Sequence, residues 1–271
     1  MASTTNNTPI DTVILDIEGT VCPITFVKDT LFPYFIEKLP SILQKFQYPL
    51  PTTTTSDNDD DDDDDPVLNI LKQLPENIIQ SWESIFNHFK NLVDQDIKDP
   101  ILKSLQGLIW KQGYENNELK APIYQDSIKF IESFPTVKSK DNQRKIYIYS
   151  SGSIKAQILL FGHVKNSSTS TTSSSIDNDT IDLNDKLNGY FDITTVGFKN
   201  QSNSYIKILQ EINKSQYPQS VLFLSDNINE VNAAINAGMK SYIVIRPGNS
   251  PINDEDKKFH KIIYSLDELD L

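Results

Sequence analysis

Polar side chains able to transfer a phosphoryl group follow four short apolar segments of the 271-residue chain. Each group stands within a few residues of the end of its segment. In chain order the groups are Asp16 and Glu18, Ser150 and Ser151, Lys199, and Asp226 with Asn227 and Glu230. Carboxylates, neighbouring hydroxyls and one ammonium group are the set that phosphoryl transfer to a carboxylate requires.

The acidic residues of this set predict a nucleophile, a metal site and an acid/base. An Asp16 carboxylate that attacks phosphorus forms an aspartyl phosphate. Because phosphate and carboxylate repel each other, a hard divalent cation must neutralise both, and Mg²⁺ with one or two carboxylates and several waters suits this task. Asp16 and Asp226 would hold the ion. Glu18 would protonate the leaving oxygen and then activate water.

The hydroxyls and the lysine predict a phosphate site. Lys199 and the hydroxyls and amides of Ser150 and Ser151 would bind the phosphate oxygens. We expect Ser151 to supply the phosphate-binding hydroxyl and Ser150 a substrate contact. For Glu230 and Asn227, the sequence is equally compatible with a role in the site and with a structural role. The structural role of Asn227 would be a helix cap.

Apolar runs that alternate with helical spacing indicate the fold. The runs cover residues 12–16, 145–149, 191–196, 220–224 and 241–245, of which 191–196 is the weakest. Their continuous apolar character is typical of strands buried on both faces of a parallel sheet. Helical patterns cover residues 154–161, 204–212 and 229–237, the last closed by Gly238. We therefore predict a doubly wound α/β domain of the Rossmann type, whose ligands bind at the carboxyl ends of the strands.

The middle of the chain predicts a second domain. Residues 26–134 have helical spacing and both tryptophans, and they contain no convincing strand. We interpret them as a helical cap inserted into an α/β core made of residues 1–25 and 135–271. Two low-complexity stretches, an Asp-rich one over about 51–66 and a Ser/Thr-rich one over about 166–182, are expected to be disordered surface loops.

Composition narrows the class of protein. The net charge of −12 disfavours sequence-independent binding to nucleic acid or to an anionic membrane. Asp57 and residues 59–65 supply eight of the 37 acidic groups, so most of this charge belongs to one loop and says little about the substrate. Cys22 is the single cysteine, and the polar N-terminus does not resemble a signal peptide. We expect a protein of the cytoplasm, with the nucleus as a second compartment.

The order of these motifs resembles a known superfamily. Asp16-Ile17-Glu18-Gly19-Thr20 after an apolar strand is similar to the Asp-x-Asp-x-Thr motif of haloacid dehalogenase-like (HAD) phosphatases. The strand-Ser, Lys and strand-Asp elements follow in the same order. Glu18 in place of the second aspartate makes the chain similar to the enolase-phosphatases of methionine salvage. Further similar segments are residues 105–110, 119–121, 146–153, 159–163, 197–199, 223–226 and 246–249.

The resemblance implies one enzyme with two activities. It enolises 2,3-diketo-5-methylthiopentyl-1-phosphate and then removes the phosphate, which gives the acireductone 1,2-dihydroxy-3-keto-5-methylthiopentene during L-methionine salvage from methylthioadenosine. It further implies one Mg²⁺ per subunit and a monomer. The base for enolisation is not evident from the sequence, and Glu18 is the simplest choice. Whether Glu18 meets the ion through its side chain, its backbone or a water is also open.

Two other functions remain compatible with the fold. One is a HAD-type phosphatase for another small phosphorylated metabolite, which would share the core motifs and differ in the cap. The other is a catalytically silent binding protein, and the intact set of Asp16, Glu18, Lys199 and Asp226 argues against it. A dehalogenase would need neither the metal nor Glu18.

Overall fold

The computed structural model describes residues 8–51, 65–136, 144–166 and 179–271. The chain forms two compact units. The sheet unit comprises Met1–Phe26 and Lys120–Leu271, and the helical unit comprises Val27–Leu119. The two low-complexity stretches fall mostly outside the described residues. No helix within the described ranges has the length and apolar character needed to cross a membrane.

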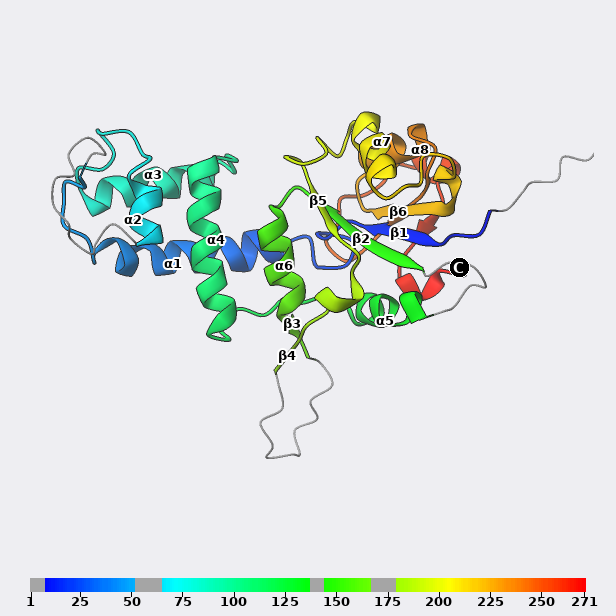
Figure 1. Cartoon of the computed structure of the whole chain (residues 1–271), viewed down its shortest axis with the longest axis horizontal. Coiled ribbons are helices and arrows are strands. Elements are labelled where there is room, and N and C mark those ends of the chain that lie inside the picture. The colour runs from blue at the N-terminus through cyan, green and yellow to red at the C-terminus, as the bar shows by residue number, and fades with distance from the viewer. Residues whose placement is uncertain (1–7, 52–64, 137–143, 167–178) are drawn as a thin grey trace, which may run out of the picture. The chain divides into compact units, whose positions relative to one another are not determined.

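A parallel sheet organises the sheet unit, as predicted, and it contains six strands (Figure 1). Its strand order is β5-β2-β1-β6-β7-β8, and every neighbouring pair is parallel. The strands are β1 (Thr12–Leu15), β2 (Lys145–Ser150), β5 (Tyr190–Asp192), β6 (Val221–Ser225), β7 (Lys240–Val244) and β8 (Ile262–Ile263). Every residue of β1 and β6 is buried, which is why both strands are continuous apolar runs.

Helices connect the strands and cover the sheet. The helices of this unit are α5 (Gln125–Ser133), α6 (Ile154–Gly162), α7 (Ser202–Glu211), α8 (Ile228–Asn236) and α9 (Asp256–Phe259). Figure 1 shows α7 and α8 on one face of the sheet and α5 on the other, which is the doubly wound arrangement. Asn227 caps α8 by accepting from the Asn229 amide, and Gly238, with a φ of +93°, ends it as predicted.

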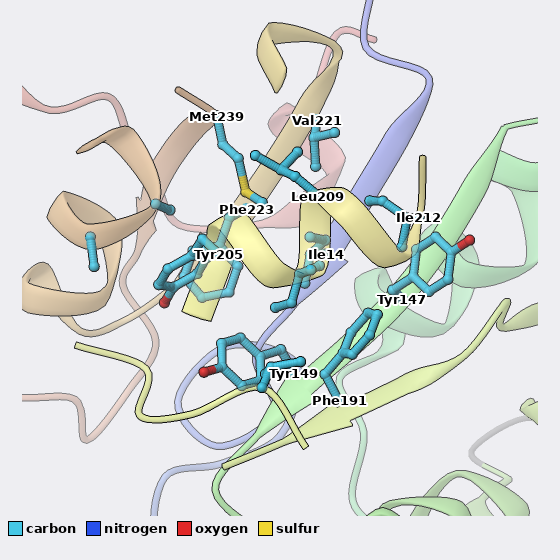
Figure 2. Close-up of a cluster of buried hydrophobic side chains, with 14 residues drawn as sticks. Ile14, Tyr147, Tyr149, Phe191, Tyr205, Leu209, Ile212, Val221, Phe223 and Met239 are labelled. Atoms are coloured by element: carbon cyan, nitrogen blue, oxygen red, sulfur yellow. The ribbon is translucent and has the colours of Figure 1, made fainter. Parts of the chain in front are cut away.

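Aromatic side chains fill the space between the sheet and α7 (Figure 2). The ring of Tyr205 meets those of Tyr149 and Phe223 edge to face, with centroids 5.5 Å and 5.1 Å away. Ile14 of β1 and Met239 belong to the same buried cluster. This packing fixes α7, and the segment that precedes it, against the middle of the sheet.

The structure differs from the predicted elements at several places. Helix α9 and the sixth strand, β8, lie beyond the last predicted strand. The strand expected over 191–196 ends at Asp192, because the Asp192 carboxylate accepts from the amides of Thr194 and Thr195 and turns the chain. A small hairpin of β3 (Val164–Lys165) and β4 (Thr180–Ile181) was not predicted. The sheet unit resumes at Lys120 and not at residue 135, so α5 belongs to it.

The helical unit contains no strand over its described residues, 27–51 and 65–119. Its helices are η1 (Val27–Leu31), α1 (Phe32–Leu43), α2 (Pro66–Leu71), α3 (Trp82–Asp94) and α4 (Pro100–Glu115). Side chains of Asp65, Ser81 and Asp99 cap the last three. Short 3-10 turns complete the chain at η3 (Phe134–Thr136), η4 (Asn184–Lys186), η5 (Pro218–Ser220) and η6 (Leu266–Glu268).

A buried arginine explains why α5 belongs to the sheet unit. Arg246 lies 2.8 Å from the Asp126 carboxylate of α5 and donates to the carbonyl oxygens of Thr20 (2.9 Å) and Tyr264 (3.1 Å). Asp126 also accepts from the Leu266 amide at 2.7 Å. One ion pair therefore joins α5, the loop after β1 and the C-terminal segment.

Replacing Asp126 by Ala should lower the free energy of unfolding by about 3 kcal/mol at pH 7, because it leaves Arg246 buried without its counter-charge. Burial alone would raise the pKa of Asp126, but the Leu266 amide and Arg246 hold it below its ordinary value. The stability that Asp126 contributes is thus complete above about pH 4 and is lost as the pH falls further.

Denaturant unfolding at several pH values tests this prediction. The difference between wild type and Asp126→Ala should be largest near pH 7 and should shrink as the pH falls below about 4. Asp254→Ala is the control, because Asp254 is exposed and forms a surface ion pair with Lys257. A difference that stays constant over the whole pH range would contradict the assignment.

Candidate active site

Strand pairing brings together the first predicted group, which begins with Asp16, and the fourth, which begins with Asp226. β1 and β6 are neighbours in register, with Leu15 opposite Leu224. The Asp16 amide donates to the Leu224 carbonyl at 3.0 Å, which continues the pairing one step past the strand. Asp16 therefore lies beside Ser225 at the carboxyl edge of the sheet, where ligands of this fold class bind.

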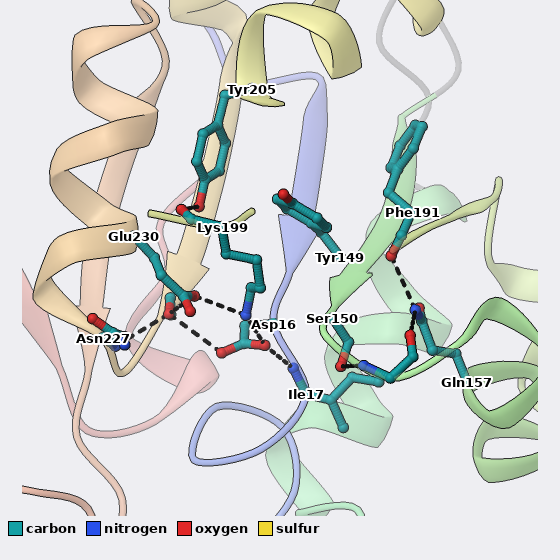
Figure 3. A network of polar contacts seen from close by, with 12 residues as sticks. Asp16, Ile17, Tyr149, Ser150, Gln157, Phe191, Lys199, Tyr205, Asn227 and Glu230 are labelled. Carbon is teal, nitrogen blue, oxygen red and sulfur yellow. Dashed lines mark hydrogen bonds and ion pairs between the residues drawn. The ribbon is translucent and has the colours of Figure 1, made fainter. Parts of the chain in front are cut away.

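Asp16 is buried, and both of its carboxylate oxygens contact polar groups (Figure 3). One of its carboxylate oxygens accepts from the Ile17 amide at 2.8 Å and from Lys199 Nζ at 2.5 Å. The other oxygen lies 3.3 Å from Ser225 Oγ. These contacts fix the carboxylate's direction at the edge of the sheet.

Lys199 is shared between two carboxylates. Its Nζ lies 2.7 Å from Glu230 Oε2 in addition to its contact with Asp16. Burial alone would lower the pKa of Lys199, but the two negative charges outweigh it and raise the pKa above its ordinary value. The Tyr205 hydroxyl donates to the Lys199 carbonyl at 2.7 Å, and the Tyr149 ring lies 5.8 Å from Nζ. The lysine is thus charged and held from both its backbone and its side chain.

Negative charge exceeds positive charge at this edge. Burial, Asp16 and Glu230 raise the pKa of Asp226 to about 7. Burial and Asp16 also raise the pKa of Glu230, although Lys199 opposes the shift. Three carboxylates therefore interact with one ammonium group. Such a surplus is relieved by a cation, and the oxygen donors suit a hard divalent one such as Mg²⁺.

The loop after β1 packs its backbone closely against Asp226. Gly19 has a φ of +74°, and a Cβ there would stand 2.5 Å from Asp226 Oδ2 and 3.0 Å from Asn249 Oδ1. Only glycine fits that conformation and that space. Asn249 Oδ1 is buried and has no hydrogen-bond partner among the described residues. The carboxylates and this acceptor without a partner together fit a small hydrated cation.

Neighbouring carboxylates in the described part of the chain do not form a ready-made cage. No group of three or more His, Cys, Asp or Glu side chains stands there in a metal-binding arrangement. Mg²⁺ commonly binds through one or two carboxylates plus waters and substrate phosphate, so Asp16 and Asp226 satisfy its minimum requirement.

The remaining predicted residues are Ser150, Ser151 and Glu18. Ser150 is buried at the end of β2, and its Oγ accepts from the Gly152 amide at 3.2 Å (Figure 3). Ser151 is exposed. Glu18 is half-buried, and its backbone bridges to Cys22. Burial and the charge of Glu18 raise the pKa of the Cys22 thiol, so this cysteine packs as a neutral side chain.

Two residues of the site were not predicted. Ser225 Oγ lies 2.8 Å from Glu230 Oε2 and accepts a hydrogen bond from the Asn227 amide, so it orients the Glu230 carboxylate. Its only signal in the sequence is its place directly before Asp226. Asn249 stands in a segment that the sequence marks only by its resemblance to a family. Glu230, left open by the sequence, directly contacts Lys199.

Comparisons with known proteins identify the family of the chain. Residues 10–238 match the model of the haloacid dehalogenase-like hydrolases. Enolase-phosphatase E1 of Candida albicans strain SC5314 is 78% identical over 98% of both chains. Enolase-phosphatase E1 of Candida tropicalis is 65% identical over 97% of this chain and 99% of its own.

Two solved structures are also similar to the chain. The crystal structure of the UTR4 protein of Saccharomyces cerevisiae has a TM-score of 0.76 and 41% identity, and the match covers 96% of this chain and 100% of that one. CbbY of Rhodobacter sphaeroides, with a TM-score of 0.53 and 14% identity over 96% of both chains, shares the fold alone. The chain is a haloacid dehalogenase-like hydrolase and belongs to the enolase-phosphatase family.

Proposed function

We propose that this enzyme enolises 2,3-diketo-5-methylthiopentyl-1-phosphate and then hydrolyses the phosphate ester, and so acts as an acireductone synthase in methionine salvage. The observation that carries the phosphatase half is the buried Asp16 carboxylate, aimed by the Ile17 amide and paired with Lys199 at the carboxyl edge of the sheet. The choice of substrate rests on the relatives named enolase-phosphatase at up to 78% identity.

Asp16 is the proposed nucleophile. Its carboxylate oxygen forms a bond to phosphorus as the bond from phosphorus to the ester oxygen breaks, which leaves an aspartyl phosphate. Glu18 donates a proton to the departing oxygen, and its carboxylate then takes a proton from the water that hydrolyses the aspartyl phosphate. The products are the acireductone and inorganic phosphate, and both side chains return to their starting states.

Lys199 and the serines at the end of β2 would bind the phosphoryl oxygens. The Lys199 ammonium already contacts the nucleophile at 2.5 Å, so it lies next to the phosphorus that Asp16 attacks. It stabilises negative charge that develops on the oxygens in the transition state. The exposed Ser151 hydroxyl is free to meet a phosphate oxygen, whereas the buried Ser150 shapes the turn through the Gly152 amide and contacts the substrate.

Asp16 and Asp226 would hold one Mg²⁺, with Glu18 as the third protein contact. The surplus of carboxylates and the partnerless acceptor Asn249 Oδ1 support this assignment. When bound, the ion neutralises the repulsion between carboxylate and phosphate and polarises the substrate's oxygens.

Glu18 is also the proposed base of the enolisation. Its carboxylate removes a proton from the carbon next to a carbonyl group, and the carbonyl oxygen takes a proton from solvent as the enol forms. Glu18 is then protonated for the phosphoryl step, and the proton that it takes from water in that step returns to solvent at the end of the cycle. Its position two residues after the nucleophile, on the same loop, supports one acid/base for both half-reactions. The helical unit would act as the cap that selects the substrate, and the enzyme would work as a monomer in the cytoplasm and nucleus.

Substrate choice is testable with the purified enzyme. With Mg²⁺, the diketo phosphate should yield both phosphate and the absorbance of the enediol, and EDTA should abolish both signals. Cleavage of a generic sugar phosphate without turnover of the diketo phosphate would instead favour a phosphatase for another metabolite.

Asp16→Asn should lower phosphate release by at least about 10³-fold, because an amide does not attack phosphorus. Circular dichroism should show an intact fold, since the amide oxygen still accepts from Ile17. Enediol formation should be reduced less than phosphate release, because Glu18 is unchanged. Full-rate phosphate release would refute the nucleophile assignment.

Lys199→Ala should lower kcat/KM by about 10²–10³-fold, because it removes a buried positive charge from the developing phosphoryl charge. Lys207→Ala is the matched control, since Lys207 is an exposed lysine of α7 and should keep wild-type kinetics. Equal effects of the two substitutions on kcat/KM would show that Lys199 has no special role.

A further inference from the structure

Two side chains of the loop that follows β7 donate hydrogen bonds to two successive carbonyl groups of the catalytic loop, the loop that begins with Asp16. Arg246 Nε donates to the Thr20 carbonyl at 2.9 Å, and Asn249 Nδ2 donates to the Gly19 carbonyl at 2.8 Å. Both acceptors belong to the loop that begins with Asp16. The two loops lie about 230 residues apart in sequence and are joined here at adjacent peptide groups.

The orientation of the Asn249 amide follows from its neighbours. Its nitrogen contacts two carbonyl oxygens, Gly19 O at 2.8 Å and Val244 O at 3.3 Å. Carbonyls accept only, so the group that faces them must be the NH₂ group. The Asn249 backbone amide is held as well, by the Arg246 carbonyl at 3.1 Å. Oδ1 therefore has a fixed direction.

That direction leads to the acidic edge. Asn249 Oδ1 and Asp226 Oδ2 lie 3.0 Å and 2.5 Å from one point, the position of a Cβ on Gly19. Both atoms are acceptors and do not bond to each other. Oδ1 is buried and has no partner in the described part of the chain. A buried acceptor in this position needs a donor from outside the protein.

We propose that Asn249 is a positioning residue of the cation site, whose Oδ1 accepts a hydrogen bond from a water carried by the ion that Asp16 and Asp226 hold. The inference rests on the proposed Mg²⁺ site. Mg²⁺ keeps several of its waters when it binds to protein, and each is a strong donor. The same side chain holds Gly19 through Nδ2, so Asn249 couples the shape of the catalytic loop to the hydration shell of the ion.

The competing explanation is that Asn249 only clamps the loop. In that case its nitrogen matters and its oxygen does not. Asn249→Ala removes both atoms, whereas Asn249→Asp removes the donor, keeps an oxygen and adds a negative charge near Asp226. Asn188→Ala is the matched control, because Asn188 also bonds the backbone of a strand, accepting from Ile146 at 2.9 Å, but at the amino end of β2.

Calorimetric titration of MgCl₂ into the EDTA-treated full-length protein separates the two explanations. Asn249→Ala should weaken Mg²⁺ binding by about 10–100-fold, the range typical of lost outer-shell contacts. Asn249→Asp should bind at least about one third as tightly as wild type. Both should lower the melting temperature measured in EDTA. Asn188→Ala should lower that temperature and leave the Mg²⁺ Kd unchanged.

Three results would overturn the inference. Wild-type affinity in a folded Asn249→Ala variant would reduce Asn249 to a clamp. Equal weakening in the Ala and Asp variants would assign the effect to the lost Gly19 contact and not to the oxygen. If wild type itself binds no Mg²⁺, the proposed cation site fails, and the role of Asn249 fails with it. The first two results would leave the proposed function intact.

Discussion

The active site depends on a lysine buried between two carboxylates. Taking Lys199 out of water costs several kcal/mol, and the contacts with Asp16 and Glu230 offset that cost. Because Asp226 adds a third carboxylate, the site still carries excess negative charge. A phosphorylated substrate is an anion, so the lysine alone does not make the site attractive to it. An approaching phosphate would therefore be repelled, and this repulsion is the physical argument for the cation proposed beside Asp16, the proposed nucleophile.

Three separate elements must meet for this contact to form, and the sheet brings them together. Asp16 follows the central strand β1, and β6, which pairs with it, leads into α8 and Glu230. Lys199 comes from the segment before α7, which the Tyr205 hydroxyl and the aromatic cluster fix against the sheet. A shift of one residue in the pairing of β1 and β6 would turn Asp16 to the opposite face.

The sequence predicts those parts of the fold that depend on local patterns. Buried strands that end in polar residues and the Gly238 cap are visible as runs and signals within a dozen residues. The end of β5 and the membership of α5 were not predicted, because they depend on the Asp192 turn and on the Arg246 ion pair. An ion pair that spans 120 positions leaves no periodic signal, and the same holds for Asn249 and Gly19.

The buried ion pairs also explain why a stability argument alone does not account for this site. Replacing a buried ion pair by apolar residues of similar volume is often neutral or stabilising. An apolar edge at β1 and β6 would therefore serve the fold as well as Asp16 and Lys199 do. Apolar residues would provide neither a carboxylate whose direction is fixed nor a charged ammonium group next to it. Preorganised charge of this kind costs stability in the free enzyme and lowers the energy of a phosphoryl transition state, so its presence is explained by catalysis.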